Sequence, residues 1–459
     1  MVAHLTDIPE ELIDNICQYL AAKDVSRFRL TCTNIRDKSY HAWATSSFQQ
    51  MEFMITRNSL QHLIDFSKHK KFGPCIRELR IHTVAISRRG LVDISIEPFR
   101  AHQAARRLQE LQEQPFELRK DELIELKKER DRIKRSRRRA YNRLSHDQNT
   151  LRKQSIDVSM LVEAMRNLPN LEVIMVYGDS DASSVWGAKD IRKMTGIYPP
   201  LAPNLLQMRH WWITETGAFN KTDAHVFATV LSAIATSGVK LRELCIRSPV
   251  AMPSRLPATP NDRSRSFIPR QTLSEAHIEL LKSAFSQLKA LHLTATSWKD
   301  DPGKLMWITR LLSLCPDLES FCLTAPHDSA QFISRISQFQ LFPKIRVLGF
   351  TKIFFSSSHI INLLINHAST LERFRLHESK MEEGSYTNII GALQSLPRLN
   401  FVDLSINYNP GWYMMNQLYE WYSADGSRAA YLILGAENSQ KMAEKLEMVI
   451  TRQLAAGAA

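Results

Sequence analysis

The sequence predicts an α/β protein in which a small helical module precedes a curved array of helix–turn–strand repeats. Three observations predict this fold: amphipathic helical spacing near the amino end, eight recurrences of the pattern apolar-x-x-apolar-x-apolar, and a strongly charged helical insertion after the first recurrence. The 459 residues are 44% hydrophobic and 23% charged, a composition that is ordinary for a globular protein. The formal net charge of +13 makes an acidic partner conceivable but does not bear on the fold.

The first element, residues 5–48, is expected to contain compact helices. Asp7 can cap the first helix, and Pro9 suits its first turn. A second helix, capped by Asp24, is expected to carry an apolar stripe formed by Val25, Phe28, Cys32 and Ile35. Because about forty residues seldom fold alone, the module must pack on the following domain, on a partner or on both. The alternative is that it only caps the repeat array.

The segment from Leu5 to Leu20, continued by Lys23-Asp24-Val25 and closed by Phe28 to Cys32, resembles an F-box. The shared pattern is an apolar residue before proline, a glutamate, paired aliphatic residues and a second helix that ends near a cysteine. The resemblance implies docking onto the Skp adaptor and, through it, onto the cullin of a cullin–RING ubiquitin ligase. It also implies residues that face the adaptor, or pack just beneath that surface, at Ile8, Pro9, Leu12, Ile13, Ile16, Leu20, Val25, Leu30 and Cys32.

The recurrences that follow predict short parallel strands, each preceded by a helix. They begin at Ile76, Leu171, Leu241, Leu288, Leu318, Ile345, Leu371 and Leu399. The last five start 30, 27, 26 and 28 residues apart, close to the ~20–29 residues of leucine-rich repeats. One such unit cannot bury its own apolar face, so neighbours must stack into a solenoid. The array resembles irregular, helix-bearing leucine-rich repeats, and the whole chain looks like an F-box/leucine-rich-repeat substrate receptor of the fungal kind.

The expected organisation is a helical module at 1–48, a solenoid of about eight repeats at 49–436, and a closing helix and tail at 437–459. Wide spacings place insertions near 84–154, 180–222 and 249–270. The first insertion is rich in helix-forming residues, and Pro115 is expected to split it.

The first insertion is also the most charged part of the chain. Between 127 and 143, ten lysines and arginines stand against two acids, a local balance of +8, with a basic patch at Lys134, Arg135, Arg137, Arg138 and Arg139. This run is interpreted as a solvated helix, a nuclear-import signal or a phosphate contact. It favours the nucleus over the cytoplasm as the location of the protein.

The sequence carries no catalytic constellation. Phosphate-binding glycine loops and the GxSxG, HExxH and CxxC motifs are all missing, so no enzyme, cofactor or metal site is predicted. The six cysteines have no metal spacing and are expected to be small buried thiols. No apolar run of ~18 residues and no apolar leader predicts a membrane or secretory segment.

Strand alternation predicts which side chains a protein substrate would meet. Counted along each recurrence, the first, fourth and sixth positions point to the core, and the third, fifth and seventh line the concave face. The substrate is expected at the charged residues Arg373, Arg375, His377, Asp403 and Arg247, unless these charges merely keep the face soluble. The alternative function is a nuclear repeat scaffold that binds RNA or chromatin through 127–143, although few aromatic residues lie there for base stacking.

Overall fold

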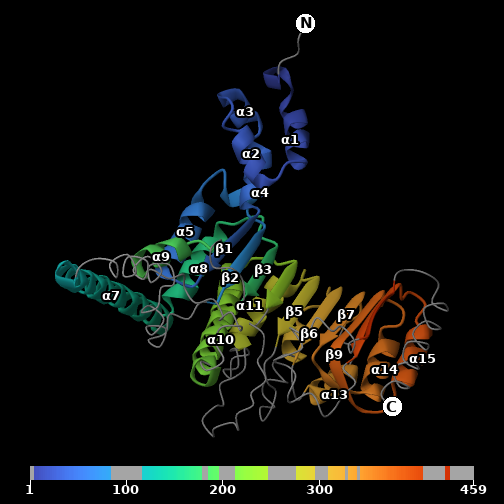
Figure 1. Cartoon of the computed structure of the whole chain (residues 1–459). Helices are drawn as coiled ribbons and strands as arrows, with labels where there is room; N and C mark the ends of the chain where they lie inside the picture. The colour runs from blue at the N-terminus through green and yellow to red at the C-terminus, as the bar shows by residue number, and fades with distance from the viewer. Residues whose placement is uncertain are drawn as a thin grey trace.

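The structure, a computed structural model, describes residues 5–83, 116–177, 185–195, 212–246, 275–294, 309–325, 329–338, 342–406 and 430–434. These residues form a helical module and a large sheet that follows it (Figure 1). The expected loop at 249–270, the closing helix and tail at 437–459, and Arg247 lie outside the described residues.

The helical module at the amino end is confirmed. It contains η1 (Leu5–Asp7), α1 (Glu10–Gln18), α2 (Ala22–Phe28), α3 (Thr33–Lys38) and α4 (Tyr40–Phe48).

The expected helix caps of the module are wrong. Asp7 lies in η1, and α1 follows Pro9 without a side-chain cap. Asp24 lies inside α2, where it pairs with Arg27 at 3.1 Å. The predicted stripe spans two helices, because Cys32 is extended and caps α3 by accepting a hydrogen bond from the Ile35 amide.

All eight expected strands are present, and the described residues add three more. The strands are β1 (Gln50–Met54), β2 (Glu78–His82), β3 (Val173–Tyr177), β4 (Glu243–Ile246), β5 (Ala290–Thr294), β6 (Ser320–Thr324), β7 (Val347–Thr351), β8 (Phe354–Ser356), β9 (Arg373–Glu383), β10 (Phe401–Ile406) and β11 (Ala430–Leu434). They join in chain order and in parallel up to β10, with β8 beside β9, while β11 is antiparallel. The parallel α/β architecture is therefore confirmed, and β1, β8 and β11 were not expected.

One backbone pattern repeats at every junction between β1 and β10. The carbonyl just before one strand accepts hydrogen bonds from two consecutive amides at the start of the next. At the first junction the Gln49 carbonyl accepts from Arg77 and Glu78, and at the last the Glu372 carbonyl accepts from Asn400 and Phe401. These N···O distances are 2.8–3.2 Å across the eight junctions, so equivalent positions of neighbouring recurrences stay in register.

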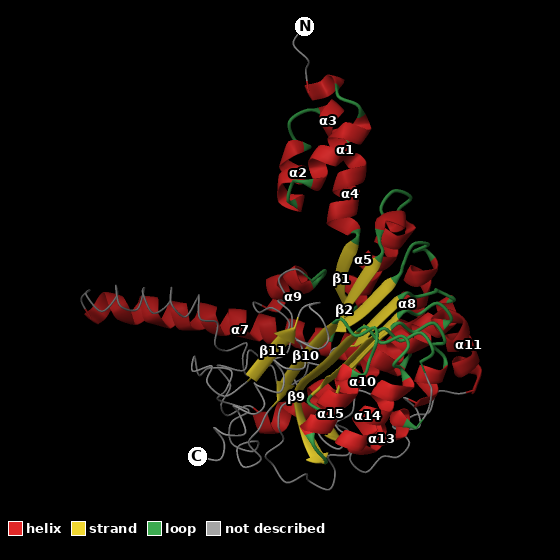
Figure 2. Ribbon diagram, turned by 90° about the vertical axis from the view of Figure 1, so that its right-hand side faces the viewer, coloured by secondary structure: helices red, strands yellow, loops and turns green. Residues whose placement is uncertain are grey.

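The core lies between the sheet and the helices that cover one of its faces (Figure 2). These are α5 (Arg57–Lys68), α8 (Ile156–Arg166), α10 (Trp212–Ser237), α11 (Glu275–Phe285), α13 (Ala330–Ser337), α14 (Ser357–Asn366) and α15 (Tyr386–Gln394). The first, fourth and sixth positions of all eight recurrences are buried, which confirms the predicted inward face. Each such side chain contributes about 1.5–3 kcal/mol, so the continuous cluster from Met51 to Leu404 dominates stability.

The first insertion contains α7 (Phe116–Lys153), a single long helix that begins directly after Pro115. Its carboxyl-terminal part packs beside α5, α8 and α9 (Ala188–Thr195), and its amino-terminal part stands clear of the sheet in Figures 1 and 2. Residues 212–222, expected within the second insertion, belong to the start of α10. None of the helices in the described ranges combines the length and apolarity required to cross a bilayer.

Candidate functional site

The helical module has a small core of its own. Ile13 and Cys17 of α1 meet Val25 of α2 and Ile35 of α3, and all four side chains are buried. Burial, assisted by the nearby Asp14 carboxylate, raises the pKa of the Cys17 thiol, so it remains protonated and packs as an apolar group. With so few side chains inside, the packing of α1–α3 depends on additional contacts.

Polar bonds hold α1 against α3 and α4. Lys38, at the end of α3, donates to the Ile8 carbonyl at 2.8 Å. Asp14 of α1 accepts from the Ala42 amide at 3.2 Å, where it satisfies a donor in the first turn of α4. These bonds fix which face of α1 points inward, and they leave the opposite face directed at solvent.

That outward face of α1 is an exposed apolar stripe. Leu12 and Ile16 of α1, together with Tyr19 and Leu20 just after its last residue, recur at helical spacing and are 51%, 39%, 90% and 36% exposed. Part of the stripe borders a groove of about 520 Å³, which is lined by Asp7, Ile8, Pro9, Leu12, Asn15, Ile16 and Tyr19. We refer to Leu12, Ile16, Tyr19 and Leu20 as the α1 stripe. Contiguous exposed apolar residues of this kind mark interaction surfaces.

The structure divides the residues that the F-box resemblance assigned to the adaptor. Pro9, Leu12, Ile16, Leu20, Leu30 and Cys32 are exposed, Ile8 is half-buried, and Ile13 and Val25 are buried beneath them. Sequence reasoning missed Tyr19, although it lies seven residues after Leu12 and therefore on the same helical face.

An aromatic cluster connects this module to the sheet. Phe48, the last residue of α4, stacks on Phe72 at 4.6 Å between ring centroids, and Trp43 meets both rings. Phe66 of α5 meets Phe48 at 5.8 Å. The Arg29 guanidinium lies 4.4 Å from the Trp43 ring centroid and adds a cation–π contact. We refer to Trp43, Phe48, Phe66 and Phe72 as the aromatic joint.

The third, fifth and seventh positions of the recurrences lie on the sheet face opposite the covering helices, here termed the open face. At its carboxyl-terminal end, Asp403 accepts a hydrogen bond from His377 Nε2 at 2.7 Å, and the Arg375 guanidinium lies 3.9 Å from the same carboxylate. Arg375 also lies over the Phe401 ring. Arg373 is exposed. The structure thus brings together Arg375, His377 and Asp403 of the expected substrate site, with Asp403 partly neutralising Arg375, and it places Arg373 two residues before Arg375 on β9.

The amino-terminal end of the open face is charged and internally paired. Arg80 bonds to Glu78 and Glu52 at 2.5 and 3.3 Å. His82 is 1% exposed, lies 3.6 Å from the Glu52 carboxylate and stacks on Tyr177. Cys245, Val173 and Gly349 are also buried, so these four outward positions do not line an open surface as expected. Their neighbours on adjacent strands cover them.

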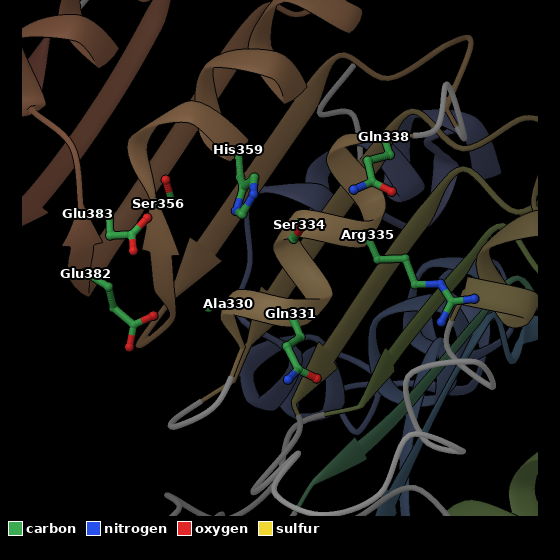
Figure 3. A pocket seen from close by; sticks show the side chains of 9 residues that line it. All are labelled: Ala330, Gln331, Ser334, Arg335, Gln338, Ser356, His359, Glu382 and Glu383. Carbon is green, nitrogen blue, oxygen red and sulfur yellow. The ribbon is translucent and has the colours of Figure 1, made fainter.

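A shallow polar hollow of about 620 Å³ lies between α13, the start of α14 and the end of β9 (Figure 3). Figure 3 shows Glu382 and Glu383 on one side of it and Arg335 on the other, with His359 between them. The charged groups do not converge on one point, so the hollow has the character of a polar surface rather than of a reaction centre.

The remaining chemistry-bearing residues are dispersed. In the described ranges, no three His, Cys, Asp or Glu side chains are placed to hold a metal ion. All six cysteines are free thiols. Cys17, Cys245 and Cys315 are buried as expected, whereas Cys75 and Cys322 are half-buried and Cys32, at the cap of α3, is exposed. Burial raises the pKa of Cys315 to about 12.

The basic patch of the first insertion lies on α7. Arg135, Arg138 and Arg139 are exposed and Arg137 is half-buried, while the side chain of Lys134 lies outside the described part.

Comparisons with known proteins identify one part of the chain. The F-box domain family matches residues 5–40, which extend from η1 to the first residue of α4. The search of curated proteins found no match for the chain. The chain therefore carries an F-box domain at its amino end, as the resemblance implied, and this domain contains the α1 stripe.

Proposed function

We propose that this protein is the substrate-recognition subunit of a Skp–cullin–F-box ubiquitin ligase. The observation that carries the proposal is the α1 stripe, which exposes four large apolar side chains within the F-box domain. Burying such side chains against a partner contributes about 25 cal/mol per Å² of apolar surface removed from water. The partner that the domain implies is a Skp-type adaptor, and the cullin would join through it.

We further propose that the sheet and its helices form a leucine-rich-repeat solenoid that binds the protein substrate. Eight recurrences with one register, one buried face and one backbone junction pattern support this interpretation. On the open face, every second side chain of each strand points outward, so neighbouring strands present rows of side chains that a partner protein can contact. The proposed substrate residues are Arg373, Arg375, His377 and Asp403, together with Arg247.

In this proposal the protein performs no chemistry of its own. It holds a substrate lysine near a conjugating enzyme that its partners carry. Holding two reactants in place raises their effective concentration, which can lower the barrier by several kcal/mol without any local catalytic group.

Adaptor binding tests the proposal directly. The full chain co-expressed with a Skp-type adaptor should elute as one complex in size-exclusion chromatography. Leu12→Asp or Ile16→Asp should weaken that complex at least ~100-fold, because each places an unpaired carboxylate in an apolar interface. Leu280→Asp on α11 is the matched control, since Leu280 is 49% exposed and Leu12 is 51% exposed. Should wild-type chain and adaptor elute separately, the receptor function would be refuted.

The substrate face needs its own test. Proteins that co-purify with the adaptor-bound chain should be lost when Arg373→Glu and Arg375→Glu are combined, because an acidic partner would then be repelled. Lys240→Glu combined with Lys282→Glu, at exposed positions away from the open face, is the charge-matched control. Equal capture by wild type and the Arg373/Arg375 variant would move the substrate site elsewhere.

A further inference from the structure

Five cationic side chains form a line along α7. Lys128, Arg132, Arg135, Arg139 and Arg143 recur at spacings of four, three, four and four residues, and all five are exposed. At 3.6 residues per turn they lie within an arc of about 80° and extend about 22 Å along the helix axis. We refer to these five residues as the cationic stripe.

Packing on the other side of α7 fixes the direction in which the cationic stripe points. Tyr141, Gln148 and Leu151 are buried on the side of the helix that faces away from the stripe. Gln148 donates to the Ile55 carbonyl at 3.1 Å, which ties the helix to the segment after β1. Because the carboxyl-terminal part of α7 cannot rotate freely, the stripe is held toward solvent.

Neighbouring groups already contact three residues of the cationic stripe, Lys128, Arg132 and Arg135. Glu125 pairs with Lys128 at 2.9 Å. Arg135 donates to the backbone carbonyl of Asp131, and that bond leaves the rest of its guanidinium available for other contacts. The pairs are exposed and therefore worth at most about 1 kcal/mol each, so a polyanion could displace them.

We propose that the cationic stripe binds the phosphate backbone of double-stranded DNA without reading its base sequence. Duplex DNA carries one negative charge per ~1.7 Å of axis, and arginine, which supplies four of the five cations, binds phosphate through two parallel hydrogen bonds. In Figures 1 and 2 the amino-terminal part of α7, where the cationic stripe begins, stands clear of the sheet, so the sheet does not block a duplex there. An α-helix of ~10–12 Å fits the ~12 Å major groove of B-form DNA.

Other polyanions fit these features less well. The major groove of an RNA duplex is deep and narrow, so it does not accommodate an α-helix as the major groove of B-form DNA does. Single strands are usually held by aromatic rings, and the stripe has none. Helices that lie on membranes insert an apolar face, whereas the described apolar residues on the other side of α7 are already buried or half-buried in the protein.

The test is fluorescence anisotropy with the full chain and a labelled 20-base-pair DNA of arbitrary sequence, between 50 and 200 mM salt. We expect binding whose log affinity falls against log salt with a slope of about −4.5, as expected for five neutralised phosphates. Changing all five stripe residues to Gln should reduce affinity at least ~100-fold at 50 mM salt and flatten the slope by about 4.5.

A matched control removes five exposed charges elsewhere, by Gln at Lys23, Lys70, Lys240, Lys282 and Arg398. This variant should bind DNA within ~3-fold of wild type. The proposal would be overturned if the control variant lost as much affinity, or if the wild type did not bind DNA at 50 mM salt. It would also be overturned if the wild type bound duplex RNA, single-stranded DNA, polyglutamate or phosphatidylserine vesicles more tightly than duplex DNA. The Leu12→Asp chain should bind DNA normally, so this result is separable from adaptor binding.

Discussion

His367 is a buried imidazole at the end of α14, 2% exposed and packed near the Phe342 ring. Burial lowers its pKa below the ordinary value of 6.5, an effect that the Phe342 backbone partly opposes. As pH falls below 6.5, the unfolded chain takes up a proton that the folded chain resists. Unfolding is therefore favoured by acid, and the stability that His367 contributes is present above its ordinary pKa and lost below it.

Removing this imidazole should reduce the acid sensitivity of the fold. Between pH 7.5 and 5.5, His367→Gln should lose less free energy of unfolding than wild type, by on the order of 1 kcal/mol in urea titrations. His41→Gln is the control, because the His41 side chain is 73% exposed. If both variants show the wild-type pH dependence, His367 does not resist protonation in the folded state.

Individual residues on the open face show where sequence reasoning stops. Alternation along a strand predicts the direction of each side chain, and the inward positions are all buried as predicted. It does not predict which side chain of the next strand covers an outward position. Asp403 and His82 are nearly buried for this reason, one between His377 and Arg375 and the other between Glu52 and Tyr177.

Among the elements, strands were predicted more accurately than caps. The recurring pattern located β2 to β7, β9 and β10, because three apolar residues at fixed offsets define a strand with one buried face. Phe48, Met51 and Phe53 repeat the same pattern and could have predicted β1, but Phe48 ends the helical module. Helix caps failed because Pro9 and Ala21 leave the first turns uncapped.

The aromatic joint connects α4 of the helical module to Phe66 of α5 and to Phe72. Phe72 contributes to its centre, because the ring stacks on both Phe48 and His69. Phe72→Ala should destabilise the fold by about 1–3 kcal/mol and loosen α4 against α5. Small-angle X-ray scattering should then give a larger maximum dimension than for wild type.

Measuring adaptor binding by the Phe72→Ala chain distinguishes a loosened contact between α4 and α5 from general misfolding. The Phe72→Ala chain should still bind the adaptor, because Phe72 is not among the residues that line the groove beside the α1 stripe. Phe72→Leu, which keeps most of the volume, should scatter like wild type. A Phe72→Ala chain that is less stable but unchanged in scattering would show that other contacts fix the orientation.

At the scale of the whole molecule, charge and apolar surface are placed on different elements. The α1 stripe is apolar, the cationic stripe lies on α7, and the carboxyl-terminal end of the open face carries partly paired cations. Sequence reasoning anticipated each feature separately. Their separation in space comes from strand order and from the packing of α7 beside α5 and α8, neither of which has a local sequence signal.

The small core of α1–α3 and the large core beneath the sheet differ greatly in size. The buried side chains of α1–α3 form a cluster separate from the one that extends from Met51 to Leu404. Local stability follows buried apolar contacts, so amides of α1–α3 should exchange with deuterium faster than those of β4 to β7. Ile13→Ala should cost the small core about 2–5 kcal/mol and accelerate exchange in α1–α3 alone.

Leu348→Ala provides the comparison, since Leu348 is buried in the large core. Leu348→Ala should lower the midpoint temperature of the main thermal unfolding transition, and the order of deuterium exchange rates among the elements should stay the same. Ile13→Ala should leave that midpoint temperature unchanged. Adding the adaptor should slow exchange in α1 of the wild type, because a partner that binds only the folded module stabilises it by mass action. If Ile13→Ala instead accelerated exchange equally in β4 to β7, the module and the sheet would unfold as one cooperative unit.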